Sequence, residues 1–553
     1  MIKARHLWLG LGASLAITSC AAPDIEESGT EARPSFDLVS SPIGAVEFEV
    51  SCNAKASDLV ERGVALTHHM MYEEANFVFG MAGNADPDCA MANWGQAMAI
   101  INPLWPTTPS MEKMQRGVDL VEKSMAQSSL NEREQAYLQT TMAYFVGGES
   151  RSEQERLTRF QSAWADLHSA FPDDEDAEAF FLLSSLAIAD PNDRTLSTQR
   201  RVGDGLEAML EARPDHPGVL HYLIHAYDFP QLAQRALPVA DHYGEVTPLV
   251  PHATHMMTHI YTRLGLWEKA IEWNSLSAET ALSICKETGT INGHYTHALD
   301  YLAYAYLQTG DDTSVLEIIA TAEALSPPYS GNLHATAYAF SAIPARYALE
   351  RRDWQAAASL EPRWPSEFPW NEAFEPYVAI THFARAIGLA RSGQAEHVDT
   401  ELAALRALRD SVAERSGYWA EQIEIQIQTA EAWRLYASGD ASEGLARMQS
   451  ASDLSMTTEK SGITPGEALP TTELLGDMLM EMERYEDALS AYEKSLERSP
   501  HRLNSLSGAA QAATMSENPD AAAIYLADIV RIAEGENVTR PIVLQARATL
   551  NGE

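Results

Sequence analysis

The chain has 553 residues, 45% of them hydrophobic, so it carries enough apolar material for a large buried core. Its 78 acidic and 39 basic residues give a net charge of −39. A surface this acidic repels nucleic acid and anionic lipid headgroups, which excludes nucleic acid as an expected partner.

The first residues form a segment that is typical of secreted proteins. A short basic region precedes an apolar stretch at residues 7–18, which is too short to span a bilayer permanently, so residues 1–19 are predicted to be a signal peptide. The stretch ends in Ile17-Thr18-Ser19-Cys20, which resembles the lipobox of bacterial lipoproteins. This resemblance implies cleavage before Cys20 and a diacylglycerol on its thiol, so the membrane is contacted through lipid alone. An ordinary signal peptide with an incidental cysteine is the alternative.

The residues after Cys20 bear on localisation. In enteric-type sorting an aspartate directly after the cysteine favours the inner membrane, whereas Ala21 stands there. We therefore expect a lipid-anchored protein of the bacterial cell envelope, at the outer membrane. Residues 20–54, rich in acidic, small and proline residues, are predicted to be the lipidated N-terminus and a flexible tether.

Four cysteines limit the disulfides that can form. Lipidation of Cys20 leaves three in an oxidising compartment, so at most one internal pair is expected. Cys52 lies just before the first helix of the first predicted repeat, and Cys89 opens the first helix of the next. Such helices run parallel at about 10 Å or less. We predict a Cys52–Cys89 disulfide and a free Cys285.

Residues 55–553 carry the 34-residue pattern of tetratricopeptide repeats, which are antiparallel helix pairs. A repeat that starts at Ala56 places Gly63 at position 8 and Phe79 at position 24, where a small residue lets helices approach and a bulky one fills the space. A single unit cannot bury its apolar face, so the units must stack. The sequence predicts an all-α, right-handed superhelical solenoid forming a single domain. Its clearest repeats are 56–89, 217–250, 251–284, 296–329 and 469–502.

Between 101 and 215 the repeat pattern is degenerate but still helical. Helix starts are predicted at 130–132 and 173–175, where acidic residues fall in the first turn. The proline-rich stretch 101–106 is predicted to be a rigid loop. No boundary divides the repeats into two domains.

Nine of the 17 histidines fall between residues 216 and 297. In three successive repeats they are spaced three or four residues apart, which places them on one face of the first helix of each repeat. In tetratricopeptide proteins of known structure, that face lines the concave groove where ligands bind. The residues predicted to project into the groove are His221, His225, Asp228, His252, His255, His259, Arg263, His294, His297, Asp300 and Tyr304.

This cluster has three interpretations. The histidines are satisfied packing or groove residues; or they hold a divalent metal; or histidine with aspartate acts as general acid and base without a metal. For the metal site we expect His221, His225, His255, His259 and His297 as ligands, with Asp228 and Asp300 as ligands or as groups that orient an imidazole. Zinc, iron, manganese and copper are all compatible with nitrogen and oxygen donors.

Other motifs narrow the chemistry. No Gly-x-Ser-x-Gly elbow or His-Glu-x-x-His motif occurs, which argues against a serine hydrolase and a zincin protease. Phosphate-binding and dinucleotide-binding glycine loops are missing after the signal segment, so no nucleotide cofactor is expected. Arg263 would attract an anionic ligand or, as the simpler expectation, pair with an acidic neighbour.

Several stretches resemble a widespread family of bacterial tetratricopeptide proteins. They are His221-Tyr-Leu-Ile-His-Ala-Tyr-Asp228, Pro251-His-Ala-Thr-His-Met-Met-Thr-His259, His297-Ala-Leu-Asp300 and Asp86-Pro-Asp-Cys-Ala-Met-Ala-Asn-Trp-Gly95. Met257 stands where family members commonly have proline. The family carries no established activity, so the resemblance implies the fold and leaves the function open.

Two functions remain at this point. The first is a lipid-anchored scaffold that binds a peptide or protein in its concave groove, with a histidine-coordinated metal ion there. The alternative is a metalloenzyme, a hydrolase or an oxidoreductase, that uses the same histidines and aspartates.

Overall fold

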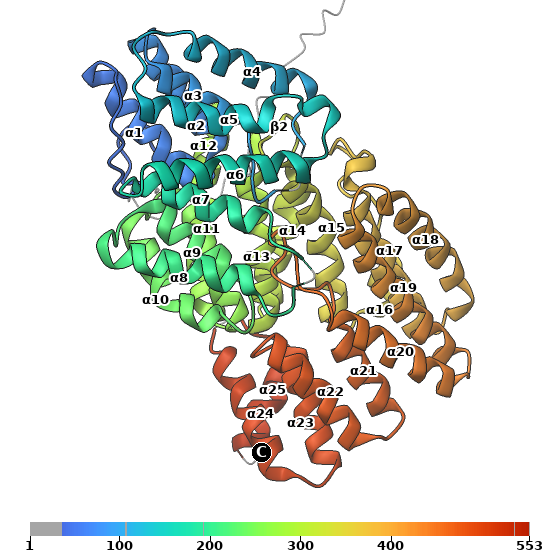
Figure 1. Ribbon diagram of the computed structural model, residues 1–553. Helices are drawn as coiled ribbons and strands as arrows, with labels where there is room; N and C mark the ends of the chain where they lie inside the picture. Colours follow the sequence, from blue (N-terminus) through green and yellow to red (C-terminus); the bar gives the residue numbers. More distant parts are fainter. Residues whose placement is uncertain (1–35, 106–107, 192, 536, 552–553) are drawn as a thin grey trace, which may run out of the picture.

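Nearly every element is a helix, and consecutive helices pack as antiparallel pairs that stack into a superhelix (Figure 1). The computed structural model describes residues 36–105, 108–191, 193–535 and 537–551. Cys20 and the predicted signal peptide lie outside these residues. The predicted class, an all-α solenoid of tetratricopeptide type, is confirmed. Among the described residues, no helix is both long and apolar enough to cross a membrane.

The N-terminal third begins with the first predicted repeat and continues through the degenerate region. Asn131 and Asp174 cap helices at the two predicted starts, and each side chain accepts a hydrogen bond from a first-turn backbone N–H. The elements are α1 (Ala54–His68), α2 (Tyr72–Ala85), α3 (Ala90–Met98), α4 (Met111–Met125), α5 (Glu132–Phe145), η1 (Gly148–Ser150), α6 (Glu153–Ala170), α7 (Glu175–Ala187) and α8 (Ser197–Ala212).

The middle third contains the histidine-rich repeats and a short parallel pairing of two strands. Its elements are α9 (Pro217–Tyr227), α10 (Ala233–Val246), α11 (Pro251–Arg263), α12 (Trp267–Thr288), β1 (Ile291–Asn292), α13 (Gly293–Thr309), α14 (Asp312–Ala324), β2 (Tyr329–Ser330), α15 (Leu333–Glu350) and α16 (Trp354–Ala358). Each of the three predicted repeats is a helix pair, and proline at the first position begins α9 and α11.

The C-terminal third completes the superhelix. Its elements are η2 (Glu372–Phe374), α17 (Glu375–Arg391), η3 (Ala395–His397), α18 (Val398–Ala413), α19 (Gly417–Ala437), α20 (Ala441–Ser455), α21 (Thr471–Glu481), α22 (Tyr485–Arg498), α23 (Leu503–Met515), α24 (Pro519–Ile532) and α25 (Pro541–Asn551). The array folds back on itself, since α23 packs on α13 and the Trp267 indole N–H donates to the His501 carbonyl at 2.9 Å.

Residues 36–53 differ from the flexible tether that was predicted over 20–54. Phe36, Ile43 and Phe48 are buried against the helices, and the backbone N–H of Ala45 donates to the Asp215 carbonyl at 3.1 Å. These apolar residues provide the burial that holds the segment against the body. Residues 36–53 are therefore part of the folded structure.

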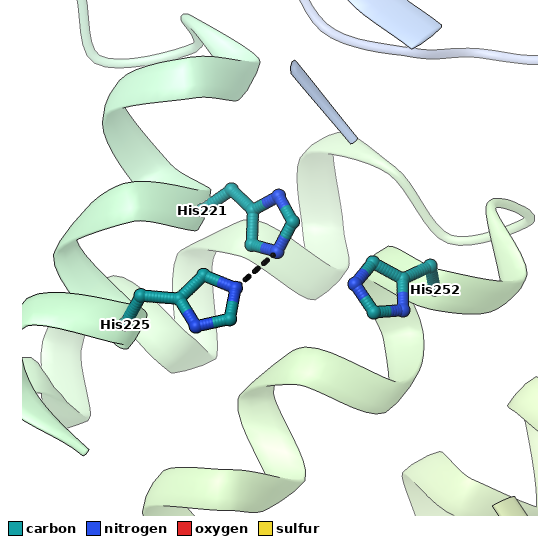
Figure 2. Close-up of side chains that lie close together, drawn as sticks. All are labelled: His221, His225 and His252. Atoms are coloured by element: carbon teal, nitrogen blue, oxygen red, sulfur yellow. Dashed lines mark hydrogen bonds between the residues drawn. The ribbon is translucent and has the colours of Figure 1, made fainter. Parts of the chain in front are cut away.

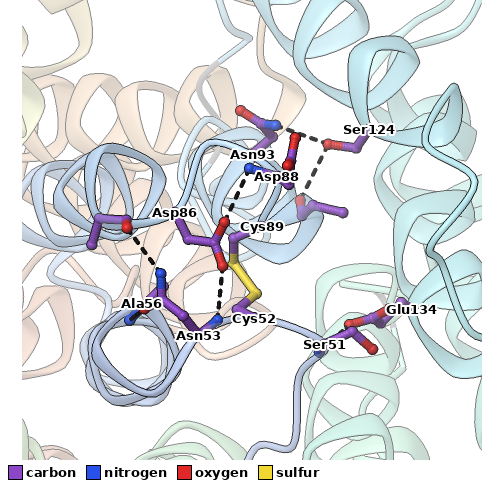
Figure 3. Close-up of a disulfide and its surroundings, with 12 residues drawn as sticks. Ser51, Cys52, Asn53, Ala56, Asp86, Asp88, Cys89, Asn93, Ser124 and Glu134 are labelled. Carbon is purple, nitrogen blue, oxygen red and sulfur yellow. Dashed lines mark hydrogen bonds between the residues drawn. A yellow bond between two sulfur atoms is a disulfide. The ribbon is translucent and has the colours of Figure 1, made fainter.

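The segment leads into the disulfide between Cys52 and Cys89 (Figure 3), the two cysteines that the sequence analysis paired. Their Cα atoms are 5.0 Å apart. Asp86 strengthens the junction, because its carboxylate accepts from the backbone N–H of Asn53 at 2.7 Å. Cys285 is free and buried. The disulfide thus ties the start of α1 to the start of α3.

The inner face of the superhelix is occupied by the chain itself. The connection between α20 and α21, which we call the inner segment (residues 456–470), runs beside α13 and α15 (Figure 1, orange). Tyr301 donates to the Thr464 carbonyl at 3.1 Å, and Arg346 donates to the Thr464 hydroxyl at 2.8 Å. The groove predicted to receive a peptide is therefore filled, over this stretch, by a peptide segment of the same chain.

Candidate metal centre

The first helices of three successive repeats, α9, α11 and α13, pack side by side. Each presents histidines to its neighbour, because residues three and four apart share one helix face. The predicted histidines are therefore brought together, but they lie in the interior and not on an open groove surface. Six of these seven histidines form two groups of three, and His294 belongs to neither.

The first group, the His255 triad, consists of His255, His259 and His297. Each residue offers one ring nitrogen, and these three atoms lie within 4.8 Å of one another. The side chains come from α11 and α13 and are only 2%, 2% and 4% exposed. Three of the five predicted ligands thus converge at one place.

Hydrogen bonds fix the tautomers of two of these rings. The Asn274 amide donates to the Ala270 carbonyl at 2.9 Å, so its oxygen faces His255 and accepts from Nδ1 at 2.8 Å. In the same way, Nδ1 of His259 donates to the Asp228 carboxylate at 3.0 Å. Both Nε2 atoms therefore carry lone pairs when the rings are neutral, and these atoms are 3.1 Å apart.

The third ring adds two further unused nitrogens. Neither Nδ1 nor Nε2 of His297 has a hydrogen-bond partner among the described residues, although the side chain is buried. Its ring centroid lies 4.3 Å from that of His255. A buried polar group without a partner costs free energy, and such groups are rare without a functional reason.

Burial also sets the protonation state. Desolvation lowers the pKa of His255 and of His297 well below the usual value of 6.5, and lowers the pKa of His259 despite its bond to Asp228. All three imidazoles are therefore neutral at pH 7, which is the form that ligates metals.

The second group, the His221 triad, consists of His221, His225 and His252 (Figure 2). Its ring nitrogens also lie within 4.8 Å of one another. Nδ1 of His221 donates to the His68 carbonyl at 2.6 Å, and its Nε2 lies 3.1 Å from Nε2 of His225. Nε2 of His252 is buried and has no partner among the described residues.

A third cluster, His68 with Asp176 and His216, has similar proximity but a different character. Asp176 accepts from Nε2 of His68 at 2.7 Å, and His216 caps α9 by accepting backbone N–H groups at its Nδ1. The Tyr222 hydroxyl donates to Nδ1 of His68 at 2.9 Å. Every ring nitrogen is satisfied, so this cluster is structural.

The two aspartates have separate roles. Asp228 binds Nδ1 of His259 and so orients a ring, one of the two roles predicted for it. Its carboxylate also pairs with Arg263 at 2.8 Å and with Lys460 at 3.0 Å, so Arg263 forms an internal ion pair. Asp300 differs from expectation, since it pairs with the buried Arg346 and belongs to neither triad.

The remaining predicted groove residues lie around the triads. The His252 and His294 ring centroids are 5.1 Å apart, and burial lowers the pKa of His294 to about 4. Tyr304 is buried and accepts from Arg502 at 3.3 Å. It packs against the inner segment and does not face a ligand groove: a Cβ on Gly466 would lie 2.8 Å from its hydroxyl.

Histidines of the two triads form part of the walls of two cavities. A cavity of about 230 Å³ is bordered by His225 and His259, with Trp105, Phe229 and Trp419 among its apolar walls. A larger cavity of about 690 Å³ is bordered by His252, His294 and His297 and by the charged side chains Glu73, Glu74, Lys113 and Arg116. Each triad therefore has at least one ring at the wall of each cavity.

Sequence reasoning missed three partners of the site. Asn274 orients His255 from α12, Lys460 reaches Asp228 from the inner segment, and Tyr301 places its hydroxyl 3.4 Å from Nε2 of His259. Tyr301 lies one helical turn after His297, so the spacing on α13 could have indicated it. Nothing in the sequence connects Lys460 with a residue 232 positions earlier.

Comparisons with known proteins bear on the fold alone. No protein-family model and no curated protein sequence matches the chain. Solved structures with the same kind of helical repeat are each 12% identical to it. The APC/C hetero-tetramer Cut9–Hcn1 matches with 89% of this chain and 90% of that chain covered and a TM-score of 0.31. The corresponding values are 90%, 89% and 0.28 for yeast Tom70 and 88%, 97% and 0.31 for the human IFIT1 dimer with m7Gppp-AAAA.

Proposed function

We propose that the chain binds a divalent transition-metal ion through His255, His259 and His297. The observation that carries this proposal is that Nε2 of His255 and Nε2 of His259 lie 3.1 Å apart. Each atom has a lone pair, because Nδ1 of the same ring holds the proton and donates it to Asn274 or Asp228. Two lone pairs at that distance repel unless a cation lies between them. A proton could serve, but burial opposes a charged ring.

The dimensions suit a metal. Nitrogen ligands at about 2.0–2.1 Å from a tetrahedral ion lie about 3.3–3.4 Å from each other. The separation of 3.1 Å between the two Nε2 atoms is close to this value. Three imidazoles with no carboxylate among them favour zinc or copper over manganese, which prefers oxygen ligands.

The second element of the proposal is that the protein is a metal-dependent enzyme acting on a small molecule. Three protein ligands leave a fourth position open, as in catalytic zinc sites. The triad borders both cavities, through His259 and His297, so a small substrate can reach it. An ion held there would supply Lewis acidity. The peptide-scaffold alternative is less well supported, because the inner segment fills the groove.

The test is metal content with matched variants. Protein prepared without a histidine tag should contain zinc or copper by elemental analysis, and His255→Ala with His259→Ala should lose the ion of this triad. The control is His382→Ala with His397→Ala, which removes two histidines that lie outside both triads. A second measurement is made with His252→Gln added to both variants, so that the His221 triad cannot bind metal in either. Added metal should then raise the melting temperature of the control and not that of the His255→Ala, His259→Ala variant. Equal metal content in the two variants would refute the proposal.

We further propose that the protein is lipid-anchored at the bacterial outer membrane through Cys20. The proposal rests on the lipobox-like Ile17-Thr18-Ser19-Cys20. The Cys52–Cys89 disulfide supports it, because such bonds persist in oxidising compartments. A Cys20→Ser variant should leave the membrane fraction on cell fractionation, and its firm retention there would contradict the proposal.

A further inference from the structure

We infer that the His221 triad is a second metal site, separate from the first. This inference rests on the proposed function, because it extends the same metal chemistry to another set of ligands. It concerns His221, His225 and His252, whose ring nitrogens lie within 4.8 Å of one another. No residue is shared with the His255 triad.

The tautomer of His221 directs a lone pair into this site. Its Nδ1 lies 2.6 Å from the carbonyl oxygen of His68, which can only accept, so Nδ1 carries the proton. Nε2 of the neutral ring is therefore a bare acceptor, and it faces Nε2 of His225 at 3.1 Å. The two rings lie one helical turn apart on α9, the spacing at which two imidazoles can hold one ion.

His252 supplies the third donor from the neighbouring helix α11. Its Nε2 is buried and has no hydrogen-bond partner among the described residues. The three rings turn toward one another in Figure 2, and the centroids of His221 and His252 are 5.1 Å apart. Burial lowers the pKa of all three imidazoles below the usual value of 6.5.

The nearby His68 cluster shows that proximity alone does not produce this arrangement. There the carboxylate of Asp176 and the hydroxyl of Tyr222 saturate the ring nitrogens of His68. In the His221 triad a hydrogen bond between Nε2 of His225 and Nε2 of His221 accounts for the approach of those two rings, whereas Nε2 of His252 is buried and has no partner among the described residues. Hydrogen bonding therefore satisfies the ring nitrogens of His68 and leaves the buried Nε2 of His252 unsatisfied, as a ligand of a metal ion would be.

The two proposed sites adjoin. The His225 and His259 ring centroids are 6.5 Å apart, and both residues border the cavity of about 230 Å³. On the other side, His252 and His297 both border the cavity of about 690 Å³. Neither triad contains a carboxylate that could bridge two ions. The two proposed ions would therefore have separate sets of ligands. A small molecule in either cavity would meet both.

The experiment counts metal ions per chain. The whole protein, freed of metal with a chelator, is titrated with Zn²⁺ and examined by native mass spectrometry, with Cu²⁺ in a parallel series. Wild-type protein should take up two ions. His252→Gln should take up one, His297→Gln one, and the double variant none. The control His242→Gln, which changes a partly exposed histidine outside both triads, should still take up two.

Folding is checked independently by far-ultraviolet circular dichroism. If His252→Gln fails to fold, His225→Gln takes its place, because His225 is only partly buried. Wild-type protein that binds one ion, with no loss in His252→Gln or His225→Gln, would overturn the second site and leave the first standing. Loss of all metal in each single variant would mean one shared site and would also overturn it. Wild-type protein that binds no ion would refute the proposed function as well.

Discussion

Single residues around the His255 triad decide which nitrogens can serve as ligands. The spacing of histidines on α11 predicted that His255 and His259 share a face, and they do. Their tautomers could not be predicted, because Asn274 lies on the other helix of the repeat and Asp228 at the end of α9. The sequence also predicted Asp300 at the site. In the structure its carboxylate instead forms an ion pair with Arg346, which lies 46 residues further along the chain.

Removing the acceptor on Asn274 should weaken metal binding at the His255 triad. Asn274→Ala frees His255 to adopt either tautomer, and loss of such an orienting partner typically costs 10–100-fold in metal affinity. Competition with a chelator measures this affinity. Asn274→Asp, which keeps an acceptor oxygen, should restore it. The control is Asn93→Ala, since Asn93 is a buried asparagine that donates to Ser124 at 3.0 Å. Equal affinities in all these variants would argue that the tautomer is not set by Asn274.

His69 should make the fold sensitive to acid. Burial lowers the pKa of His69 to about 3, while its pKa in the unfolded chain is about 6.5. Below pH 6.5 the unfolded chain therefore binds a proton that the folded chain does not, and the free energy of unfolding falls. Between pH 7 and pH 5 this one residue accounts for about 2 kcal/mol.

The variant His69→Gln tests this effect, because its amide can still donate to the Ile43 carbonyl. Urea denaturation in the presence of a chelator should show that the free energy of unfolding of wild-type protein falls by about 2 kcal/mol more than that of the variant over this interval. An equal fall in both would show that His69 titrates normally.

At the scale of helices, the repeat pattern was a reliable guide. Each of the five clearest predicted repeats contains an antiparallel helix pair, and in the first and last of them the glycine at position 8 lies against the aromatic residue at position 24. The sequence could not show the inner segment, since a stretch without helical periodicity carries no signal of where it packs. The division of the histidines into two triads was also hidden, because it depends on how α9, α11 and α13 are offset.

Close helix contact makes Gly63 intolerant of a side chain. A Cβ at this position would lie 2.6 Å from the Phe79 ring, so Gly63→Ala should lower the free energy of unfolding by about 1–3 kcal/mol. Gly417→Ala is the control, because a Cβ there has no neighbour within 4 Å in α19. Its free energy of unfolding should change by less than about 1 kcal/mol. Chemical denaturation compares the two, and equal effects would contradict close packing at Gly63.

At the scale of the whole molecule, the superhelix closes around a polar interior. The C-terminal repeats fold back onto α13, and the inner segment joins α9, α11, α13 and α15 through Lys460, Glu459 and Thr464. Stacked first helices were predicted to line an open groove. The structure instead places the histidines between two cavities, which favours small-molecule chemistry over peptide binding.

The central claim is that a metal ion lies among the Nε2 atoms of His255 and His259 and a ring nitrogen of His297. Its most direct test is crystallography of protein purified without a histidine tag, with diffraction data collected on both sides of the zinc and copper absorption edges. An anomalous peak is expected about 2.0–2.1 Å from each of these nitrogens. An ordered His255 triad with no anomalous peak, in crystals grown with added Zn²⁺ or Cu²⁺ at neutral pH, would contradict it.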